Sequence, residues 1–283
     1  QRIQNNDFST GHGTSTKVDI EQDYIDRIKS DIKIDKPLNI VVDAGNGVAG
    51  NISPKLFEAL GANVTKLFCL VDGTFPNHHP DPSKPKNLID IIQEVKDTGA
   101  DMGFAFDGDG DRLGLIDNKG NVIWADRQMI LYSRDILERN PGAKIVFDVK
   151  CSSLLPKDIS EHGGEPIMSR TGHSFIKAKL KETGAALGGE MSGHIFFKER
   201  WYGFDDALYA GARLLEILSK TDKTCAEVFA DLPDSINTPE INIHFDEQGD
   251  QFSAMDKLAE NVSFEGAKIT TIDGVRVDYP NGW

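Results

Sequence analysis

Residues 104–116 read Phe-Ala-Phe-Asp-Gly-Asp-Gly-Asp-Arg-Leu-Gly-Leu-Ile, a polar tip between two apolar stems. The stems predict two short strands, and single glycines between the aspartates let the backbone turn. Residues at alternate positions of an extended tip face the same way, so Asp107, Asp109 and Asp111 should direct their carboxylates toward one point. Three such carboxylates repel one another unless a cation lies among them, and hard oxygen ligands suit Mg²⁺ or Ca²⁺. We therefore predict a divalent-cation site at this tip.

The tip has two other interpretations, a solvated acidic hairpin and an EF-hand loop. A solvated acidic hairpin stays open because Asp and Gly are ordinary turn residues. An EF-hand loop fails on spacing, because Arg112 would stand where that loop needs glycine and Asn118 where it needs glutamate. A guanidinium beside a metal-binding carboxylate cluster is well placed to bind a phosphate through two hydrogen bonds. Metal and arginine together indicate phosphate chemistry.

Length and composition are ordinary for a soluble protein of about two domains. The chain has 283 residues, and none of its apolar runs approaches the roughly 18 to 20 residues of a membrane span. A net charge of −14 argues against nucleic acid and against an anionic membrane as partners. Cys69, Cys151 and Cys225 lack metal-binding spacing and fit unpaired thiols in a reducing cytoplasm. Because the sequence starts at Gln1 and stops at Trp283, directly after a turn-like Pro-Asn-Gly, we expect a piece of a longer protein.

Strands alternate with helices along the chain, which predicts an α/β fold with mainly parallel sheets. The pattern occurs twice, because Ile40-Val-Val-Asp43 is echoed by Ile145-Val-Phe-Asp148, and Lys96-Asp-Thr-Gly-Ala100 by Lys181-Glu-Thr-Gly-Ala185. We therefore expect two similar three-layer α/β domains in tandem, followed by an incomplete α+β segment. The expected divisions are a linker from a missing upstream domain (1–19), a domain with the metal-binding loop (20–120), a second α/β domain (121–232) and the start of a truncated α+β domain (233–283).

The last segment has a pattern of its own. Residues 241–245 alternate as a strand, residues 251–260 have a helical pattern, and residues 268–277 predict a hairpin about Asp273-Gly274 with a type I′ turn. A strand, a helix and a hairpin make the first half of an α+β unit. Its core is therefore expected to be incomplete.

The loop Asp43-Ala-Gly-Asn-Gly-Val-Ala-Gly50 supports a rival hypothesis. It contains G-x-G-x-x-G between a strand and a helix, with Asp72 further along, which is the fingerprint of a dinucleotide site and would indicate an NAD-dependent dehydrogenase. Ser53-Pro54 begins the helix too late for the third glycine to pack on the strand, and a dehydrogenase leaves the aspartate tip unexplained. A tight strand-to-helix connection is the better interpretation. A non-catalytic metal-binding module is the third hypothesis.

Two loops of the second domain carry candidate ligands for a phosphate or a sugar. Lys150 follows a strand, and open α/β sheets bind ligands at the carboxyl ends of their strands. Thr171-Gly172-His173-Ser174 precedes a helix, so its N–H groups and the His173 side chain are placed to meet a phosphate or a sugar. The alternative for Lys150 is an ordinary surface lysine, and for the second loop an ordinary turn.

A third loop follows the last strand of that domain. Residues 188–194, Gly-Gly-Glu-Met-Ser-Gly-His, place Glu190, Ser192 and His194 at alternating positions. A carboxylate and a hydroxyl together suit the hydroxyl groups of a sugar. An ordinary turn is again the alternative.

Taken together, these motifs resemble those of the α-D-phosphohexomutase family. Over residues 38–283 the sequence carries DAGNGVAG, DGDGDR, TGHS and GGEMSGH in the family's order, and its FPNHHPDP loop is most similar to the bacterial phosphomannomutase/phosphoglucomutase branch. The resemblance implies the second and third of the family's four domains, plus the start of the fourth. It also implies Mg²⁺ on Asp107, Asp109 and Asp111, sugar recognition by Glu190 and Ser192, and a substrate surrounded by Lys150, Thr171, Gly172, His173 and His194.

Two parts of the family pattern do not occur in this sequence: a T-A-S-H-N-P-type serine loop, which is the phosphoryl donor, and an R-x-S-N-T phosphate-binding loop. The resemblance implies that a phosphoserine from a missing N-terminal domain phosphorylates a mannose or glucose phosphate. The bisphosphate then reorients and returns its other phosphate, with His173 or His194 as general acid/base. We therefore expect the missing N- and C-terminal domains to be partners of this chain, and the chain alone to be inactive as an isomerase.

Overall fold

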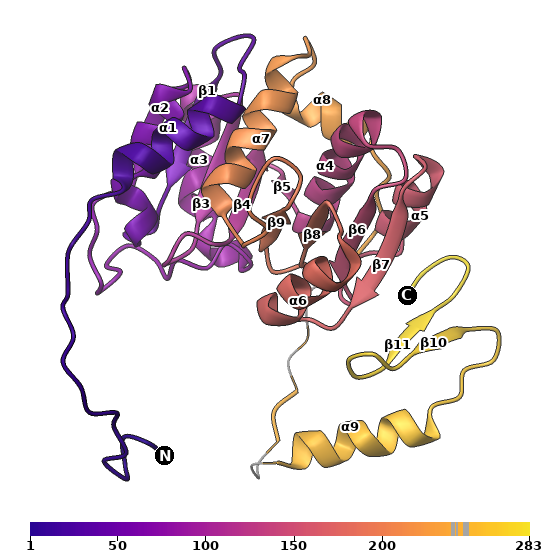
Figure 1. Ribbon diagram of the computed structural model, residues 1–283. Helices are drawn as coiled ribbons and strands as arrows, with labels where there is room; N and C mark the ends of the chain where they lie inside the picture. The colour runs from indigo at the N-terminus through magenta and orange to yellow at the C-terminus, as the bar shows by residue number, and fades with distance from the viewer. Residues whose placement is uncertain (239–240, 242, 246–248) are drawn as a thin grey trace.

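Two α/β units lie side by side in the computed structural model, which describes residues 1–238, 241, 243–245 and 249–283 (Figure 1). The sheet of the first unit has the order β2-β1-β3-β4-β5, with β1, β2 and β3 parallel and β4 and β5 antiparallel to their neighbours. Its strands are β1 Asn39–Asp43, β2 Asn63–Leu67, β3 Met102–Phe106, β4 Leu113–Asp117 and β5 Val122–Ile123. Its helices are α1 Glu21–Asp31, η1 Val48–Asn51, α2 Ser53–Ala59, η2 Pro85–Asn87 and α3 Ile89–Thr98.

The second unit repeats this plan. Its sheet has the order β7-β6-β8-β9, with the first three strands parallel and β9 antiparallel to β8, so β6, β7, β8 and β9 correspond to β1, β2, β3 and β4. Its elements are α4 Ala125–Arg139, β6 Lys144–Asp148, α5 Leu154–Glu161, β7 Glu165–Ser169, α6 His173–Thr183, β8 Leu187–Gly189, β9 Ile195–Phe197, α7 Ala207–Ser219 and α8 Cys225–Ala230. The duplication predicted from the two echoed segments is confirmed.

Each sheet is covered by helices on both faces, as expected for three layers. In the first unit Val41 and Ala105 pack under α3, while Ile40 and Phe104 face the opposite side. In the second unit Val146 packs under α6 in the same way. This alternation along the strands follows from the period of two, which turns successive side chains to opposite faces.

The inner faces of the two sheets share one hydrophobic core, and α7 runs between them. The close approach of α7 to the first unit requires a glycine in this helix. A Cβ at Gly211 would lie 3.1 Å from the Phe57 ring and 3.4 Å from that of Phe104. The hydroxyl of Tyr132 donates to the carbonyl of Ala210 at 2.9 Å from the other side. The two units are therefore packed as a single body.

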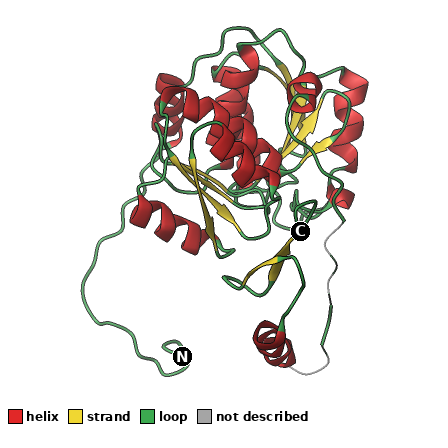
Figure 2. Ribbon diagram, turned by 90° about the vertical axis from the view of Figure 1, so that its right-hand side faces the viewer, coloured by secondary structure: helices red, strands yellow, loops and turns green. Residues whose placement is uncertain are grey.

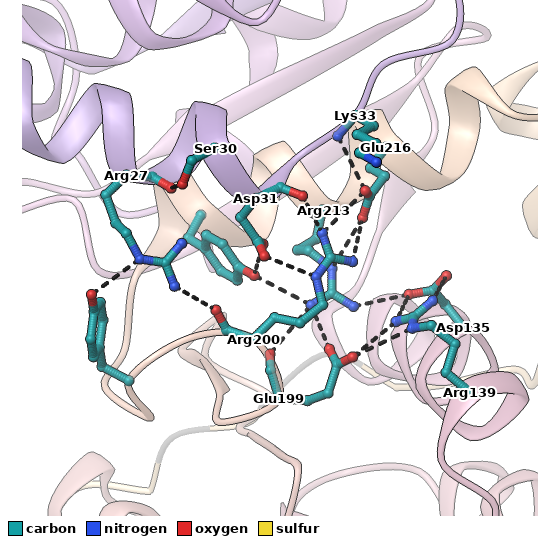
Figure 3. Close-up of polar contacts among 12 residues, drawn as sticks. Arg27, Ser30, Asp31, Lys33, Asp135, Arg139, Glu199, Arg200, Arg213 and Glu216 are labelled. Atoms are coloured by element: carbon teal, nitrogen blue, oxygen red, sulfur yellow. Dashed lines mark hydrogen bonds and ion pairs between the residues drawn. The ribbon is translucent and has the colours of Figure 1, made fainter.

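A network of charged side chains joins α1, α4 and α7 (Figure 3). Arg213 of α7 is fully buried and donates to Asp135 of α4 (2.9 Å) and to Glu199 (2.9 Å). Arg200 binds Asp31 of α1 (3.1 Å) and Glu216 of α7. Buried charges lose their hydration and are tolerated only when paired, so this network favours one particular placement of α1, α4 and α7.

The last segment lies apart from this body. It contains α9 Asp250–Asn261 and the antiparallel pair β10 Lys268–Thr270 and β11 Arg276–Asp278. No residue of α9 is buried, and in both views the helix stands away from the two units (Figures 1 and 2). The expected hairpin is present, but the hydrogen-bond contact of its turn with the second unit was not anticipated.

Three expectations differ from the structure in detail. The first sheet continues through β5, beyond the division expected at residue 120. The turn of the last hairpin is not type I′, because that turn needs positive φ at both central residues and only Gly274 has it (φ 69°). Residue 241 and residues 243–245 are not in a strand, and residue 242 lies outside the described residues.

Among the helices of the described residues, none is long and apolar enough to cross a membrane.

Candidate functional site

The candidate site forms where two hairpin tips, one from each unit, meet. The aspartate tip, residues 107–112, joins β3 to β4, and the second tip, residues 190–194, joins β8 to β9. The N–H of Leu113 donates to the carbonyl of Gly193 at 3.1 Å, and Arg112 and His194 form an antiparallel bridge. Gly193 has a φ of 105°, which favours glycine at this position. The backbone itself therefore places the predicted metal loop beside the predicted sugar loop.

The aspartate tip is folded around Asp107. Its Oδ1 accepts hydrogen bonds from the N–H groups of Gly110, Asp111 and Arg112, each at 3.0 Å, and the residue is 2% exposed. The tip is thus a tight turn closed by its first carboxylate, and not the extended segment expected from the sequence. The convergence of the three carboxylates is nevertheless present, because a ligand oxygen from each of Asp107, Asp109 and Asp111 lies within 4.8 Å of the others.

This donor set fits a hard divalent cation. All three groups offer carboxylate oxygens, which Mg²⁺ and Ca²⁺ prefer. Asp107 is buried, Asp111 is partly exposed and Asp109 is exposed, so the cluster opens to solvent on one side. Asp109 and Asp111 also line a cavity of about 320 Å³, together with Tyr24 and others. A ligand in this cavity would therefore lie beside two of the three candidate metal ligands.

Arg112 lies at the base of the tip, held by two carboxylates. Its Nε donates to Oδ2 of Asp107 at 2.6 Å and its Nη1 donates to Oδ1 of Asp81 at 3.1 Å. The side chain is 24% exposed. Asp81, in the long loop after β2, was not among the predicted site residues. The only sequence signal for it was its place in the FPNHHPDP motif.

Glu190 opens the second tip and is 1% exposed. Its Oε1 accepts the N–H of Gly172, and its Oε2 lies 3.0 Å from Nδ1 of His194. The hydroxyl of Ser192 is 2.7 Å from the same ring nitrogen. On the other side, Nε2 of His194 is 3.3 Å from Oδ1 of Asp111. His194 therefore connects the two tips through its side chain as well as through its backbone.

The environment of His194 favours its protonated form. Burial acts to lower its pKa, but hydrogen bonds and the charges of Asp111 and Glu190 outweigh burial and raise the pKa to about 9. The ring stacks on that of His173, with 5.9 Å between centroids and an angle of 19°. His173 is 54% exposed, and its Nδ1 lies 3.5 Å from Oδ2 of Asp205. Asp205 is a further acidic neighbour that the sequence did not single out.

The N–H groups of the loop before α6 are already in use. That of Thr171 donates to Asp273 (3.0 Å) and that of Gly172 donates to Glu190. The prediction that the N–H groups of this loop meet a phosphate or a sugar stays a prediction, and in the structure two of these groups bond side-chain carboxylates. The His173 side chain is exposed, but its Nδ1 already lies 3.1 Å from Nζ of Lys177.

Buried aspartates end the central strand of each unit and organise the loops around it. Asp43 accepts the N–H of Gly45 (2.8 Å), and its other oxygen lies 3.0 Å from Nε2 of His78. That hydrogen bond raises the pKa of His78 to about 8. Asp148 accepts the N–H of Cys151 (3.1 Å) and the hydroxyl of Thr171 (3.3 Å). Burial raises the pKa of Asp148.

Lys150 follows Asp148 and is exposed at the carboxyl end of β6. This is the same edge of the sheet that carries the Thr171 loop, since Asp148 bonds both loops. The structure therefore places Lys150 on the edge predicted from the sequence.

The glycine loop does not form a dinucleotide cradle. The N–H of Val48 donates to the carbonyl of Gly108 in the aspartate tip (3.0 Å). A Cβ at Gly47 would lie 2.8 Å from the same oxygen, and a Cβ at Gly50 would lie 2.3 Å from the carbonyl oxygen of Cys69. These glycines are required for packing of backbone on backbone, which is the interpretation preferred from the sequence.

Comparison with known proteins identifies both units. Sequence models described as "Phosphoglucomutase/phosphomannomutase, alpha/beta/alpha domain II" and "alpha/beta/alpha domain III" match residues 22–120 and 124–236. The phosphomannomutase/phosphoglucomutase of Pseudomonas putida is 55% identical over 282 residues, which are 100% of this chain and 61% of that protein. The phosphoglucomutase of Neisseria meningitidis serogroup A is 57% identical over 272 residues, 96% of this chain and 59% of that protein.

Solved structures give the same result. The crystal structure of a phosphoglucomutase/phosphomannomutase family protein from Burkholderia thailandensis superimposes with a TM-score of 0.92 at 52% identity, and covers 99% of this chain and 59% of that one. This chain therefore spans about three-fifths of the length of the relatives that it matches, 61% in the Pseudomonas putida protein.

Proposed function

This chain belongs to the phosphoglucomutase/phosphomannomutase family, and we propose that it is the metal- and sugar-binding part of a phosphohexomutase. The proposed reaction moves phosphate between the 1 and 6 positions of glucose or mannose through a bisphosphate intermediate. The observation that carries this proposal is the pairing of the two tips, with His194 3.3 Å from Asp111 and backbone hydrogen-bonded contact at Leu113 and Gly193. Groups for a metal and groups for a sugar are thereby brought together.

We assign Mg²⁺ to Asp107, Asp109 and Asp111, whose oxygens lie within 4.8 Å of one another. When bound, the ion would neutralise negative charge on a transferring phosphoryl group. Three carboxylates with one divalent ion still leave a net charge of about −1, which repels a dianionic phosphate. In this proposal Lys150 and Arg112 supply positive charge toward the phosphate, although Asp81 at 3.1 Å offsets part of the charge of Arg112.

We assign recognition of the sugar hydroxyls to Glu190 and Ser192, supported by Thr171 and Gly172. Glu190 accepts the N–H of Gly172, so the two loops are joined at this point. Proton transfer to and from the sugar hydroxyl is assigned to the stacked pair His173 and His194. His173 is the more accessible ring, and His194 is held between Glu190 and Asp111.

The phosphoryl donor is proposed to be a phosphoserine in the part of the relatives' length that this chain does not span. The donor would approach the aspartate tip from the cavity that Asp109 and Asp111 line. The cytoplasm is the compartment that we propose for the enzyme.

A coupled assay tests this function. The full-length protein should convert glucose 1-phosphate or mannose 1-phosphate in the presence of Mg²⁺ and the matching hexose 1,6-bisphosphate. Residues 1–283 alone should not, although they should bind Mg²⁺, because the serine that carries the phosphoryl group is proposed to lie outside this chain. Turnover by 1–283 at the full-length rate would place the donor inside this chain, with Ser192 the first serine to replace. Binding of NAD without turnover of hexose phosphates would instead support a dehydrogenase.

A further inference from the structure

The hairpin of β10 and β11 contacts two loops of the candidate site. Asp273, in its turn, accepts the N–H of Thr171 through Oδ2 at 3.0 Å. Arg276, in β11, reaches the loop after β6, where its Nη1 donates to the carbonyls of Val149 (2.5 Å) and Cys151 (2.6 Å). These two residues are the immediate neighbours of Lys150. One guanidinium therefore holds the backbone on both sides of the lysine.

Arg276 is built into this contact. It is only 5% exposed, and its Nε and Nη2 donate to the carboxylate of Asp278 at 2.8 to 3.0 Å. The ring of Trp283 covers it, with 4.5 Å from the guanidinium carbon to the ring centre. Burying a guanidinium is costly unless its N–H groups are paired. The fork of arginine is planar and rigid, so Asp278 sets the direction in which Nη1 points.

The N–H groups of the same loop are bonded to the second unit. That of Val149 donates to the carbonyl of Ser169 (3.0 Å), and that of Cys151 donates to the carboxylate of Asp148 (3.1 Å). Lys150 is exposed between these two residues. On both sides of Lys150, at Val149 and Cys151, the N–H group is bonded within the second unit and the carbonyl is bonded to Arg276 of the hairpin.

We propose that Arg276 is a positioning residue that directs Lys150 toward the substrate phosphate. Arg276 acts through the carbonyls of Val149 and Cys151 and does not itself touch the substrate. This inference rests on the proposed function, which assigns Lys150 to the phosphate. It makes the hairpin, although it belongs to the last segment of the chain, a part of the site in the second unit.

The test is a double-mutant cycle in the full-length protein, using Arg276→Ala, Lys150→Ala and the two together. Arg276→Ala should lower kcat/KM for glucose 1-phosphate by roughly tenfold to a hundredfold, mainly through KM, as expected for loss of a charge-assisted contact to phosphate. In the Lys150→Ala background, the same change should cost less than about threefold, because the side chain that Arg276 positions is gone. Equal losses in the two backgrounds would overturn the proposal.

Arg276→Lys separates positioning from charge. Lysine keeps the positive charge but cannot bond Asp278 and two carbonyls with one rigid fork, so it should recover only part of kcat/KM. Full recovery would show that charge alone matters and would overturn the proposal. The cycle can be run with this variant where Arg276→Ala does not fold. Lys268→Ala is the matched control, because it removes an exposed positive charge from the opposite strand, in register with Asp278, and should leave kcat/KM unchanged.

Hydrogen exchange gives a readout that does not depend on activity. In Arg276→Ala, without substrate, the N–H groups of residues 149–152 should exchange at least about tenfold faster, because the loop carbonyls lose their partner. Unchanged exchange would overturn the proposal. If the unmodified protein does not convert hexose phosphates, the proposed function fails. The exchange result still decides whether Arg276 holds this loop.

Discussion

The two α/β units have the same strand order but use the acidic residue after the third strand of each sheet in opposite ways. In the first unit Asp107 turns back into its own tip and binds three of its N–H groups. In the second, Glu190 contacts His194 of its own tip and also accepts the N–H of Gly172 from a separate loop. The first arrangement fixes a small loop that presents two further carboxylates. The second arrangement joins two separate loops, so a single scaffold carries both the site that we propose for a metal and the site that we propose for a sugar.

The buried aspartates of the central strands differ in a parallel way. Asp43 pairs with a histidine, His78, whereas Asp148 binds the hydroxyl of Thr171. Each carboxylate fastens neighbouring loops at the end of its strand. Only the first has a partner that titrates near neutral pH. Loss of a tip carboxylate should therefore weaken a different ligand in each unit. The free energy of unfolding should depend on pH through His78 of the first unit.

The largest expected effect is loss of the metal from the first tip. Asp109→Asn should weaken Mg²⁺ binding by at least about a hundredfold, since even partners outside the ligand shell cost about 10–100-fold. The free energy of unfolding without metal should change little, because Asp109 is exposed and its loss relieves repulsion among the carboxylates. Calorimetric titration with Mg²⁺ measures this, and Asp97→Asn, an exposed aspartate in α3, is the control. An unchanged affinity would contradict the metal assignment.

Removing the charge of Glu190 in the second tip should weaken binding of a hexose phosphate and not of Mg²⁺. Glu190→Gln keeps the shape of the side chain and an acceptor for Gly172, but removes the charge. Binding of a hexose phosphate should weaken by about tenfold, the scale of one charge-assisted hydrogen bond, while Mg²⁺ affinity stays the same. Titration of each variant with both ligands checks the division of labour, with Glu182→Gln, exposed on α6, as the control. If Glu190→Gln weakened Mg²⁺ as much as Asp109→Asn does, the two tips would not be specialised as described.

The smallest expected effect is the pH response of the first unit. The hydrogen bond from Asp43 raises the pKa of His78 to about 8 from 6.5, so protonated His78 stabilises the folded state. This contribution is fully present below pH 6.5 and is lost as the pH rises through about 8. Solvent screening limits it to about 1 kcal/mol or less.

Urea unfolding at pH 6 and pH 9 measures this contribution. The free energy of unfolding should fall more over that interval in the unmodified protein than in His78→Gln. All other groups titrate equally in both proteins, so the difference isolates His78. His12→Gln, in the exposed N-terminal stretch, should behave like the unmodified protein. A pH response identical in His78→Gln would exclude the Asp43 pair as its source.

Much of the molecule follows from the sequence because its signals are local. The alternation of strands and helices, the duplicated plan and the convergence of Asp107, Asp109 and Asp111 all depend on residues close together in the chain. Hydrophobic periodicity and turn residues act over such short distances. The same locality explains why the G-x-G-x-x-G loop was ambiguous. Its meaning depends on what the glycines touch, and Gly50 meets the carbonyl of Cys69, beyond α2 and β2.

Only the tertiary structure decided how the loops combine. Leu113 meets Gly193, Arg112 meets Asp81, and Arg276 reaches Val149, each across a long stretch of chain. The carboxylates that occupy the N–H groups of Thr171 and Gly172 come from Asp273 and Glu190 in the same way. Such contacts depend on the relative placement of whole elements, which here is set by a shared core around α7 and by a buried charge network. Residue types and spacing thus determined which chemical groups are available, and packing determined which of them meet.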